Sequence, residues 1–264
     1  MPGVTLSAWI DSASLGEGFA TALVTDDWLQ GRSAFGGLQA VTAWLAMRTL
    51  VPGTMPLRAL QMNFIAPVPA GALQAEANVL RVGKSVTQVE ARLLAGGQRC
   101  ASAVGLFGAA RASQLVHRPV RPDVTCGQPV DFPFRAGITP AFTQHFSARW
   151  LRGSPPFSGG SSRESVVELA LHDTGTCSEA HVLAIADFIP PVALSMLSAP
   201  TPGSSLAWML ELSALDYAAM PLSGWRIDSE MVAAGEGYTS QSNRIWGPKG
   251  DLVALSRQSM VVFG

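Results

Sequence analysis

A run from Ser33 to Leu50 restricts the possible fold more than any other part of the sequence. It reads SAFGGLQAVTAWLAMRTL, in which Gly36 and Gly37 precede an almost wholly apolar segment without proline. Such a segment predicts a helix that is buried on most sides, because a surface helix keeps one polar face. The first N–H groups of that helix have no partner within it, and the glycines leave them open to approach. The helix could therefore hold a partly negative oxygen at its start, although a tight turn leading into a helix has the same pattern.

The composition indicates a large core and excludes two kinds of partner. Of 264 residues, 48% are hydrophobic and 14% charged, and the formal net charge is −1. A chain this apolar buries a sizeable core and is not disordered. Because it has no long basic run, we expect no nucleic-acid partner. We also expect no membrane insertion, since no apolar stretch reaches spanning length without a break.

The cysteines and the start of the chain favour a cytoplasmic location. Cys100, Cys126 and Cys177 are odd in number and far apart, which is typical of a reducing compartment. The first residues do not combine a basic region with a following apolar one, so we expect no signal peptide. Neither the cysteines nor the four histidines have the spacing of metal ligands. We therefore expect no metal and no cofactor.

Hydrophobic periodicity predicts the same order of elements twice, a strand and a helix followed by four strands. In the first half these are residues 19–24, a helix at 37–50, and strands at 57–65, 72–81, 86–94 and 99–107. In the second half they are residues 142–150, a helix at 182–197, and strands at 206–215, 225–233, 237–246 and 252–263, with an extra apolar piece at 165–171. Antiparallel strands round one long helix are an α+β arrangement. We expect two units, residues 1–110 and 136–264, joined by a connector at 111–135.

Several segments, taken in order, resemble the acyl-CoA thioesterase II family, whose fold is a double hotdog. They are Phe35-Gly36-Gly37, FIAP at 64–67, VGKS at 82–85, ADF at 186–188, LELSALD at 210–216 and LVALSRQ at 252–258. The resemblance implies two antiparallel sheets, each wrapped round a long central helix, that form one continuous sheet. It also implies an enzyme of fatty acid metabolism that hydrolyses acyl-CoA to free acid and CoA, as a homodimer or higher homo-oligomer.

The resemblance also implies the catalytic residues. In the family, an Asp on the second helix, a Thr on the next strand and a Gln on the last strand hold the hydrolytic water. The Asp and the Gln match Asp187 and Gln258, whereas the Thr position falls on Ala214. Its neighbour Ser213 is the candidate for the third role, although it would face the other side of the sheet unless a bulge intervenes.

Physical chemistry offers two interpretations of each matched residue. Asp187 lies in an apolar run, where an unpaired charge is costly, and it is also placed to cap a helix that begins at Pro190. Desolvation would raise its pKa and make it a base near neutral pH. Gln258 either orients a water, because an amide donates and accepts, or occupies an ordinary polar position on a wet sheet face.

The substrate-binding candidates are Phe35, Gly36, Gly37 and Asn63. The amides of the two glycines could polarise the thioester carbonyl, and Asn63 could line the site. Two alternatives to a thioesterase stay open. An enoyl-CoA hydratase-like hotdog enzyme would pair an Asp with a His, and His181 is the histidine nearest to a helix opening. A non-catalytic acyl-CoA-binding protein would need no water-activating group.

Overall fold

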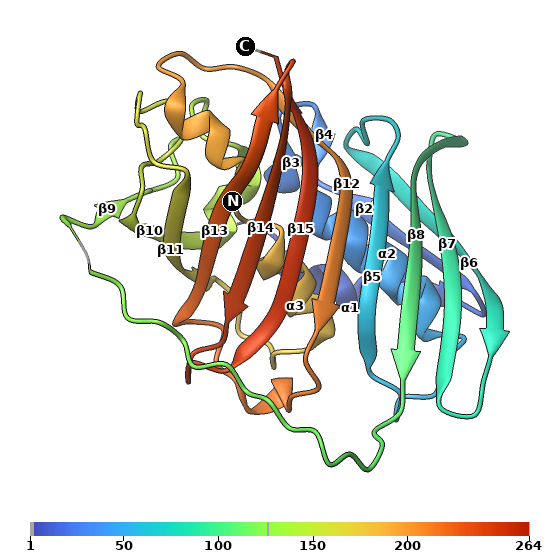
Figure 1. Cartoon of the computed structure of the whole chain (residues 1–264). Helices are drawn as coiled ribbons and strands as arrows, with labels where there is room; N and C mark the ends of the chain where they lie inside the picture. Colours follow the sequence, from blue (N-terminus) through green and yellow to red (C-terminus); the bar gives the residue numbers. More distant parts are fainter. Residues whose placement is uncertain (1–2, 126, 264) are drawn as a thin grey trace.

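A single curved antiparallel sheet organises this computed structural model, which describes residues 3–125 and 127–263 (Figure 1). The first half contributes β1 (Ser14–Gly16), β2 (Phe19–Val24), β5 (Leu57–Phe64), β6 (Gly71–Val82), β7 (Val86–Ala95) and β8 (Gln98–Gly108). The second half contributes β9 (Val130–Asp131), β10 (Phe146–Arg152), β11 (Glu164–Leu171), β12 (Gly203–Leu212), β13 (Trp225–Gly235), β14 (Tyr238–Trp246) and β15 (Leu252–Val262). A separate two-stranded sheet is formed by β3 (Leu29–Gln30) and β4 (Ser33–Ala34).

The order of the 13 strands shows how the two halves are joined. It is β1-β2-β6-β7-β8-β5-β12-β15-β14-β13-β11-β10-β9, so the two halves repeat one order outward from the β5–β12 pair. In that pair Leu60 lies opposite Leu210. The continuous sheet confirms the predicted α+β double hotdog.

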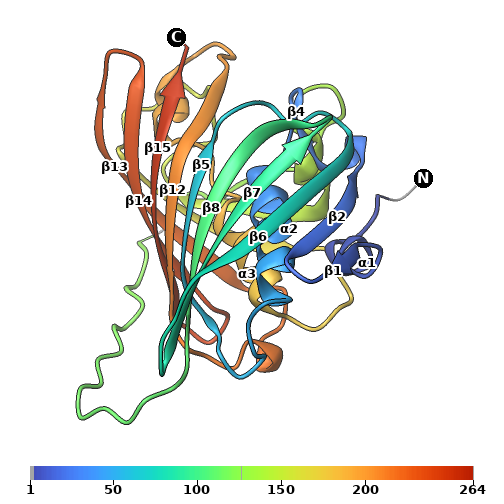
Figure 2. The ribbon, with the colours of Figure 1, turned by 90° about the vertical axis from the view of Figure 1, so that its right-hand side faces the viewer.

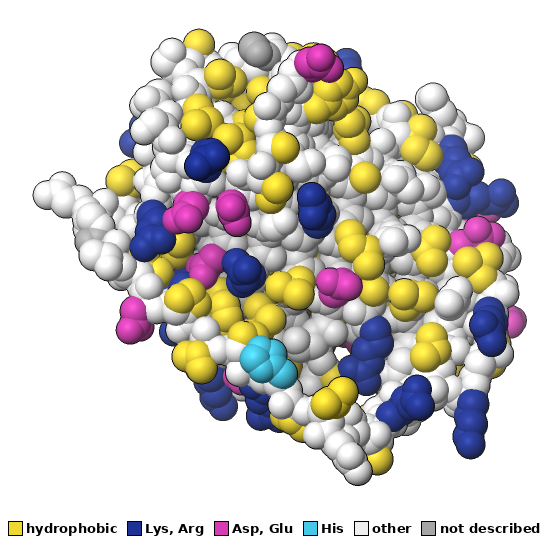
Figure 3. Space-filling model, viewed as in Figure 1, with side chains coloured by type: hydrophobic (Ala, Val, Ile, Leu, Met, Phe, Trp, Pro, Cys, Tyr) yellow, Lys and Arg dark blue, Asp and Glu magenta, His cyan; other side chains and the backbone are white. Residues whose placement is uncertain are grey.

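Side chains of both charges and hydrophobic ones are mixed on the face turned to the viewer, without one dominant charged patch (Figure 3).

The helices lie on the concave side of the sheet, as the turned view shows (Figure 2). They are α1 (Leu6–Asp11), α2 (Gly36–Arg48) and α3 (Glu179–Ala186), with 3-10 turns η1 (Asp26–Trp28), η2 (Ala141–His145), η3 (Val192–Met196) and η4 (Tyr217–Ala219). Ten of the thirteen residues of α2 are buried. This agrees with the apolar pattern of the helix, which has no polar face to present to water.

The structure corrects the predicted correspondence between the two halves. Strand β11 pairs with β13 as β2 pairs with β6, so β11 is the counterpart of β2. The prediction that matched residues 142–150 with residues 19–24 was therefore wrong. Those residues form η2 and then β10, which lies outside β11 at the place that the short β1 takes in the first half.

The second helix is also shorter than predicted. Instead of spanning residues 182–197, α3 ends at Ala186, and Asp187 is its C-cap. Pro190 and Pro191 follow, and proline cannot supply the N–H that a continuing helix needs. The prediction that Asp187 caps the start of a helix at Pro190 was wrong, because Asp187 stands where a helix ends. The early end of α3 places this carboxylate between the two halves.

The two long helices pack against each other at close range. A methyl group on Gly37 would lie 3.0 Å from the Cα of Ala184, so only glycine allows this approach. At the other end of α3, Glu179 accepts hydrogen bonds from the Trp44 indole (2.7 Å) and the Leu57 N–H (2.6 Å). The start of α2 therefore meets the end of α3.

Two further observations concern the helices and the cysteines of the described residues. None of the helices that the structure describes is both long and apolar enough to cross a bilayer. Cys100 and Cys177 are free and buried. Cys126, the third cysteine of the sequence, lies outside the described residues.

Candidate active site

Asp187 occupies the open end of α2. Its carboxylate accepts a hydrogen bond from the Gly37 N–H, and a methyl group on Gly36 would lie 2.6 Å from its Oδ2. Phe35, the N-cap of α2, makes no capping hydrogen bond with its side chain. The start of α2 therefore holds a negative oxygen, but this oxygen belongs to the protein. The Gly37 amide therefore faces Asp187, and its role in polarising a substrate carbonyl stays a prediction.

A chain of hydrogen bonds leads from Asp187 across the sheet. Gln258 on β15 donates from Nε2 to Asp187 Oδ1 (2.9 Å), and Gln241 on β14 donates from Nε2 to Gln258 Oε1 (3.2 Å). The Val192 N–H then donates to Gln241 Oε1 (2.9 Å). Gln241 was not among the site residues predicted from the sequence. Strand alternation puts it on the inner face, but only the pairing of Gln241 with Gln258 reveals its partner.

Burial raises the pKa of Asp187 to about 7, whereas the hydrogen bonds from Gly37 and Gln258 act in the opposite direction. These are the only two groups that favour its charged form within the described part of the chain. The residue is half-buried because it faces a cavity while the surrounding protein excludes water. A carboxylate with a pKa near neutrality can accept a proton from water at physiological pH.

The cavity in front of Asp187 and Gln258 encloses about 70 Å³ and is mostly apolar. Its apolar lining consists of Phe132, Pro140, Phe142, Trp150, Pro156, Phe188, Ile189, Pro190, Pro191 and Met260. The other polar residues on its wall are Gln30, Thr143 and Ser205. Convergent polar groups in an apolar hollow are typical of a site for a small organic ligand.

The structure places the other predicted residues away from the carboxylate. Phe35 is buried and stacks on Phe142, with ring centroids 4.1 Å apart, so it supports the cavity wall from behind. Asn63 is exposed on β5 while its neighbour Met62 is buried, which puts Asn63 on the outer face of the sheet. Ser213 follows the end of β12 and donates its N–H to the Val253 carbonyl. Neither Asn63 nor Ser213 is brought to Asp187.

The neighbour of Gln258 on β12 also differs from the expectation. Trp208 lies opposite Gln258, and β12 ends at Leu212, so neither Ser213 nor Ala214 lies on the strand beside Gln258. A register shift between Ser205 and Ala207 interrupts the strand near this point. Ser205 is the hydroxyl of β12 that lines the cavity. The bulge is a feature that the alternating pattern alone could not locate.

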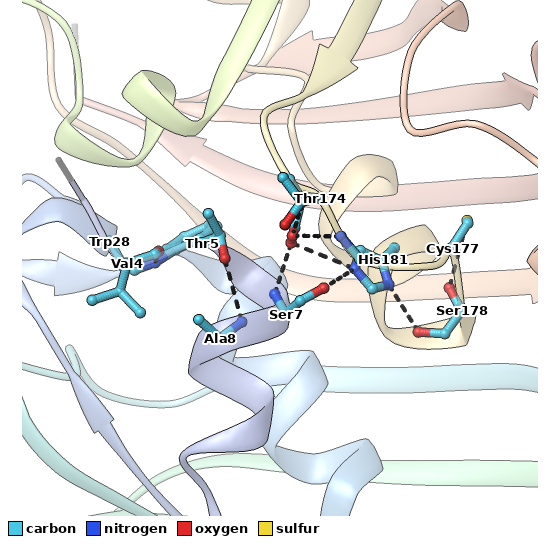
Figure 4. Close-up of polar contacts among 11 residues, drawn as sticks. Val4, Thr5, Ser7, Ala8, Trp28, Thr174, Cys177, Ser178 and His181 are labelled. Atoms are coloured by element: carbon cyan, nitrogen blue, oxygen red, sulfur yellow. Dashed lines mark hydrogen bonds and ion pairs between the residues drawn. The ribbon is translucent and has the colours of Figure 1, made fainter.

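A second polar cluster joins α1 to α3 (Figure 4). Ser7 Oγ and Asp173 Oδ2 both face Nε2 of His181, at 3.1 and 3.6 Å, while Ser178 Oγ lies 2.9 Å from Nδ1. In a Ser-His-Asp triad the carboxylate is hydrogen-bonded to the histidine, whereas Asp173 Oδ2 lies 3.6 Å from the ring and accepts from the Ser7 N–H (2.7 Å) instead, so this cluster does not have that geometry. His181 lies near the start of α3 and Asp187 at its end, so the structure does not pair them as a hydratase-like site would require.

The fold and the site together define a double-hotdog protein with a carboxyl group of raised pKa at the wall of an apolar cavity. Residues 24–108 match the family model for the acyl-CoA thioesterase N-terminal domain, and residues 123–262 match the model for the C-terminal domain. The chain belongs to the acyl-CoA thioesterase family, and these domains make it a thioester hydrolase.

Solved structures show the same fold over nearly the whole chain. A hotdog-fold protein of unknown function from Alicyclobacillus acidocaldarius has a TM-score of 0.84 at 20% identity, covering 97% of both chains. An acyl-CoA thioesterase II, TesB2, from Mycobacterium marinum has a TM-score of 0.73 at 16% identity, covering 97% of this chain and 96% of its own. The tesB protein of Mycobacterium avium subsp. paratuberculosis has a TM-score of 0.76 at 14% identity, covering 98% of both. A comparison with curated proteins found no match.

Proposed function

We propose that this protein hydrolyses an acyl-CoA to the free acid and CoA with a water molecule that Asp187 activates. The observation that carries the proposal is the Asp187 carboxylate, hydrogen-bonded to Gln258 at the wall of an apolar cavity. The water oxygen bonds to the thioester carbonyl carbon while Asp187 accepts the water proton. The carbon–sulfur bond then breaks, and this proton passes to the departing CoA sulfur.

The other groups of the site orient the water rather than react. The Gln258 Nε2 carries two hydrogens, and the one not used by Asp187 is available to the water or to the developing oxyanion. Ser205, on the cavity wall, supplies a hydroxyl on β12 in place of the family Thr. A cytoplasmic location, a role in fatty acid metabolism and a homo-oligomeric assembly remain predictions from the resemblance.

A thiol-release assay over a panel of short, long, branched and aromatic acyl-CoAs tests this function. We expect one equivalent of free CoA per equivalent of acid for at least one acyl class. Thermal stabilisation by acyl-CoA without thiol release would instead indicate a binding protein. Hydration of an enoyl-CoA without thiol release would indicate the hydratase alternative.

The pH dependence of the reaction follows from the raised pKa of Asp187. Because only the ionised carboxylate accepts a proton, kcat/KM is expected to rise with pH, to reach half its maximum near pH 7 and to level off above pH 8. Steady-state rates between pH 5.5 and pH 9 measure this profile. A flat profile over that range would exclude Asp187 as the base, since the group would then not titrate during the reaction.

A further inference from the structure

We propose that Gln241 is a positioning residue, which determines that the nitrogen end of the Gln258 amide, rather than its oxygen end, faces Asp187. The inference rests on the proposed function, because it concerns the residue that supports the catalytic carboxylate. It assigns a role to the buried Gln241 amide, which does not contact the cavity. This role was not predicted from the sequence.

The problem that Gln241 solves is the symmetry of a glutamine side chain. The two ends of an amide have nearly the same shape but opposite hydrogen-bonding roles. The Nε2 end of Gln258, which faces Asp187, donates to the carboxylate and stabilises it. The Oε1 end in the same place would repel the carboxylate. Rotation of the amide by half a turn would therefore change the site without changing its packing.

The direction of the hydrogen-bond chain is set by its first member. The Val192 N–H is a backbone donor and cannot reverse its role, so Gln241 must turn Oε1 toward it (2.9 Å). The nitrogen of Gln241 then faces Gln258, which must present Oε1 (3.2 Å). Only the nitrogen of Gln258 is left for Asp187. Each step leaves one orientation because a donor must meet an acceptor.

The local structure makes this chain rigid. Val192 is the first residue of η3, where a backbone N–H has no partner within the helical turn. Gln241 is 0% exposed and Gln258 is 2% exposed, so solvent does not compete for these groups. Pro190 and Pro191, which precede Val192, line the cavity. Gln241 therefore also ties the cavity wall to the strand that lies beside Gln258.

Two substitutions of Gln241 separate its polarity from its bulk. Gln241→Met removes the hydrogen bonds at similar size, and we expect kcat to fall about tenfold. In Gln241→Glu, at a pH where the buried carboxylate is ionised, this group accepts from both sides, so Gln258 must turn its nitrogen away from Asp187. We expect kcat to fall about 100-fold and the pH midpoint of the reaction to rise by about one unit, since Asp187 loses a donor and faces an oxygen.

Asn243 provides the matched control. It lies two residues along β14 on the same buried face and donates to Ser256 Oγ (3.2 Å), outside the chain that reaches Asp187. Asn243→Leu should lower stability about as much as Gln241→Met and leave the pH midpoint unchanged. In a Gln258→Met background, Gln241→Met should cause no further loss of kcat, because Gln241 acts only through Gln258.

The pKa of Asp187, followed by the 13C chemical shift of its carboxyl carbon, gives a readout that needs no turnover. We expect this pKa to be higher in folded Gln241→Glu protein than in the wild type. An unchanged pKa together with a kcat within twofold of wild type would overturn the inference. If the wild type released no thiol at all, the proposed function would fail, while the carboxyl titration would still decide the role of Gln241.

Discussion

Replacing Asp187 with asparagine is expected to lower kcat by a factor of about 100 to 10,000, the usual contribution of a general base. Asparagine has nearly the same shape as aspartate, and its oxygen can still accept from Gln258 Nε2, which reaches Asp187 at 2.9 Å. It cannot take up the proton of the attacking water. Thiol release from the best acyl-CoA of the panel measures the loss.

The same substitution is expected to stabilise the protein at pH 8. The pKa of Asp187 is raised from 3.8 to about 7 in the folded state, so folding favours the protonated form. The stability that this provides is complete below about pH 4 and is lost as the pH rises through 7, an effect of up to about 4 kcal/mol. Asparagine does not ionise and avoids this loss. In urea titrations, the free energy of unfolding of the variant relative to that of the wild type should therefore increase as the pH rises from 4 to 7.

Asp173 provides a control with the opposite sign. Burial raises the pKa of this carboxyl, but hydrogen bonds from the N–H groups of Ser7, Gly175 and Thr174 outweigh burial and hold the pKa below its ordinary value. Its contribution to stability is present at neutral pH and lost in acid. Asp173→Asn should therefore destabilise the protein at pH 7 and retain turnover.

A turnover of Asp187→Asn equal to wild type would remove Asp187 from the mechanism.

Replacing Gly36 with alanine is expected to lower kcat/KM about 100-fold. The added methyl carbon would lie 2.6 Å from Asp187 Oδ2 and 3.3 Å from two ring atoms of Phe64, so the carboxylate must move. A displacement of about 1 Å in a catalytic group can cost this factor. Alanine has a higher helix propensity than glycine, so we expect little loss of helix stability. Steady-state rates and thermal unfolding separate the two effects.

Gly235 offers a matched control for the added methyl group. A Cβ at this position of β13 meets nothing within 4 Å. Gly235→Ala should therefore leave kcat/KM unchanged. Wild-type kcat/KM in Gly36→Ala would contradict the close contact between Gly36 and the carboxylate on which the proposed site depends.

Local patterns in the sequence predict some parts of the fold and the site and not others. The apolar run after Gly36 and Gly37 predicts the buried helix, and strand alternation predicts most of β5 to β8 and β12 to β15. Asp187 and Gln258, which the family resemblance singled out, do meet in the structure. Gln241 and Ser205 were missed, because nothing in their own neighbourhood distinguishes them from other polar strand residues.

The amino-acid pattern was therefore sufficient for the type of most elements and for the duplicated α+β order, since periodicity depends on residues close together in the chain, and the family resemblance supplied the hotdog layout. It could not locate the end of α3, the true counterpart of β2 or the bulge at Ser205. The orientation of Gln258 depends on hydrogen bonds between residues 71, 17 and 49 positions apart. Packing of the helices and strands brings these residues together, and local propensity carries no information about such contacts.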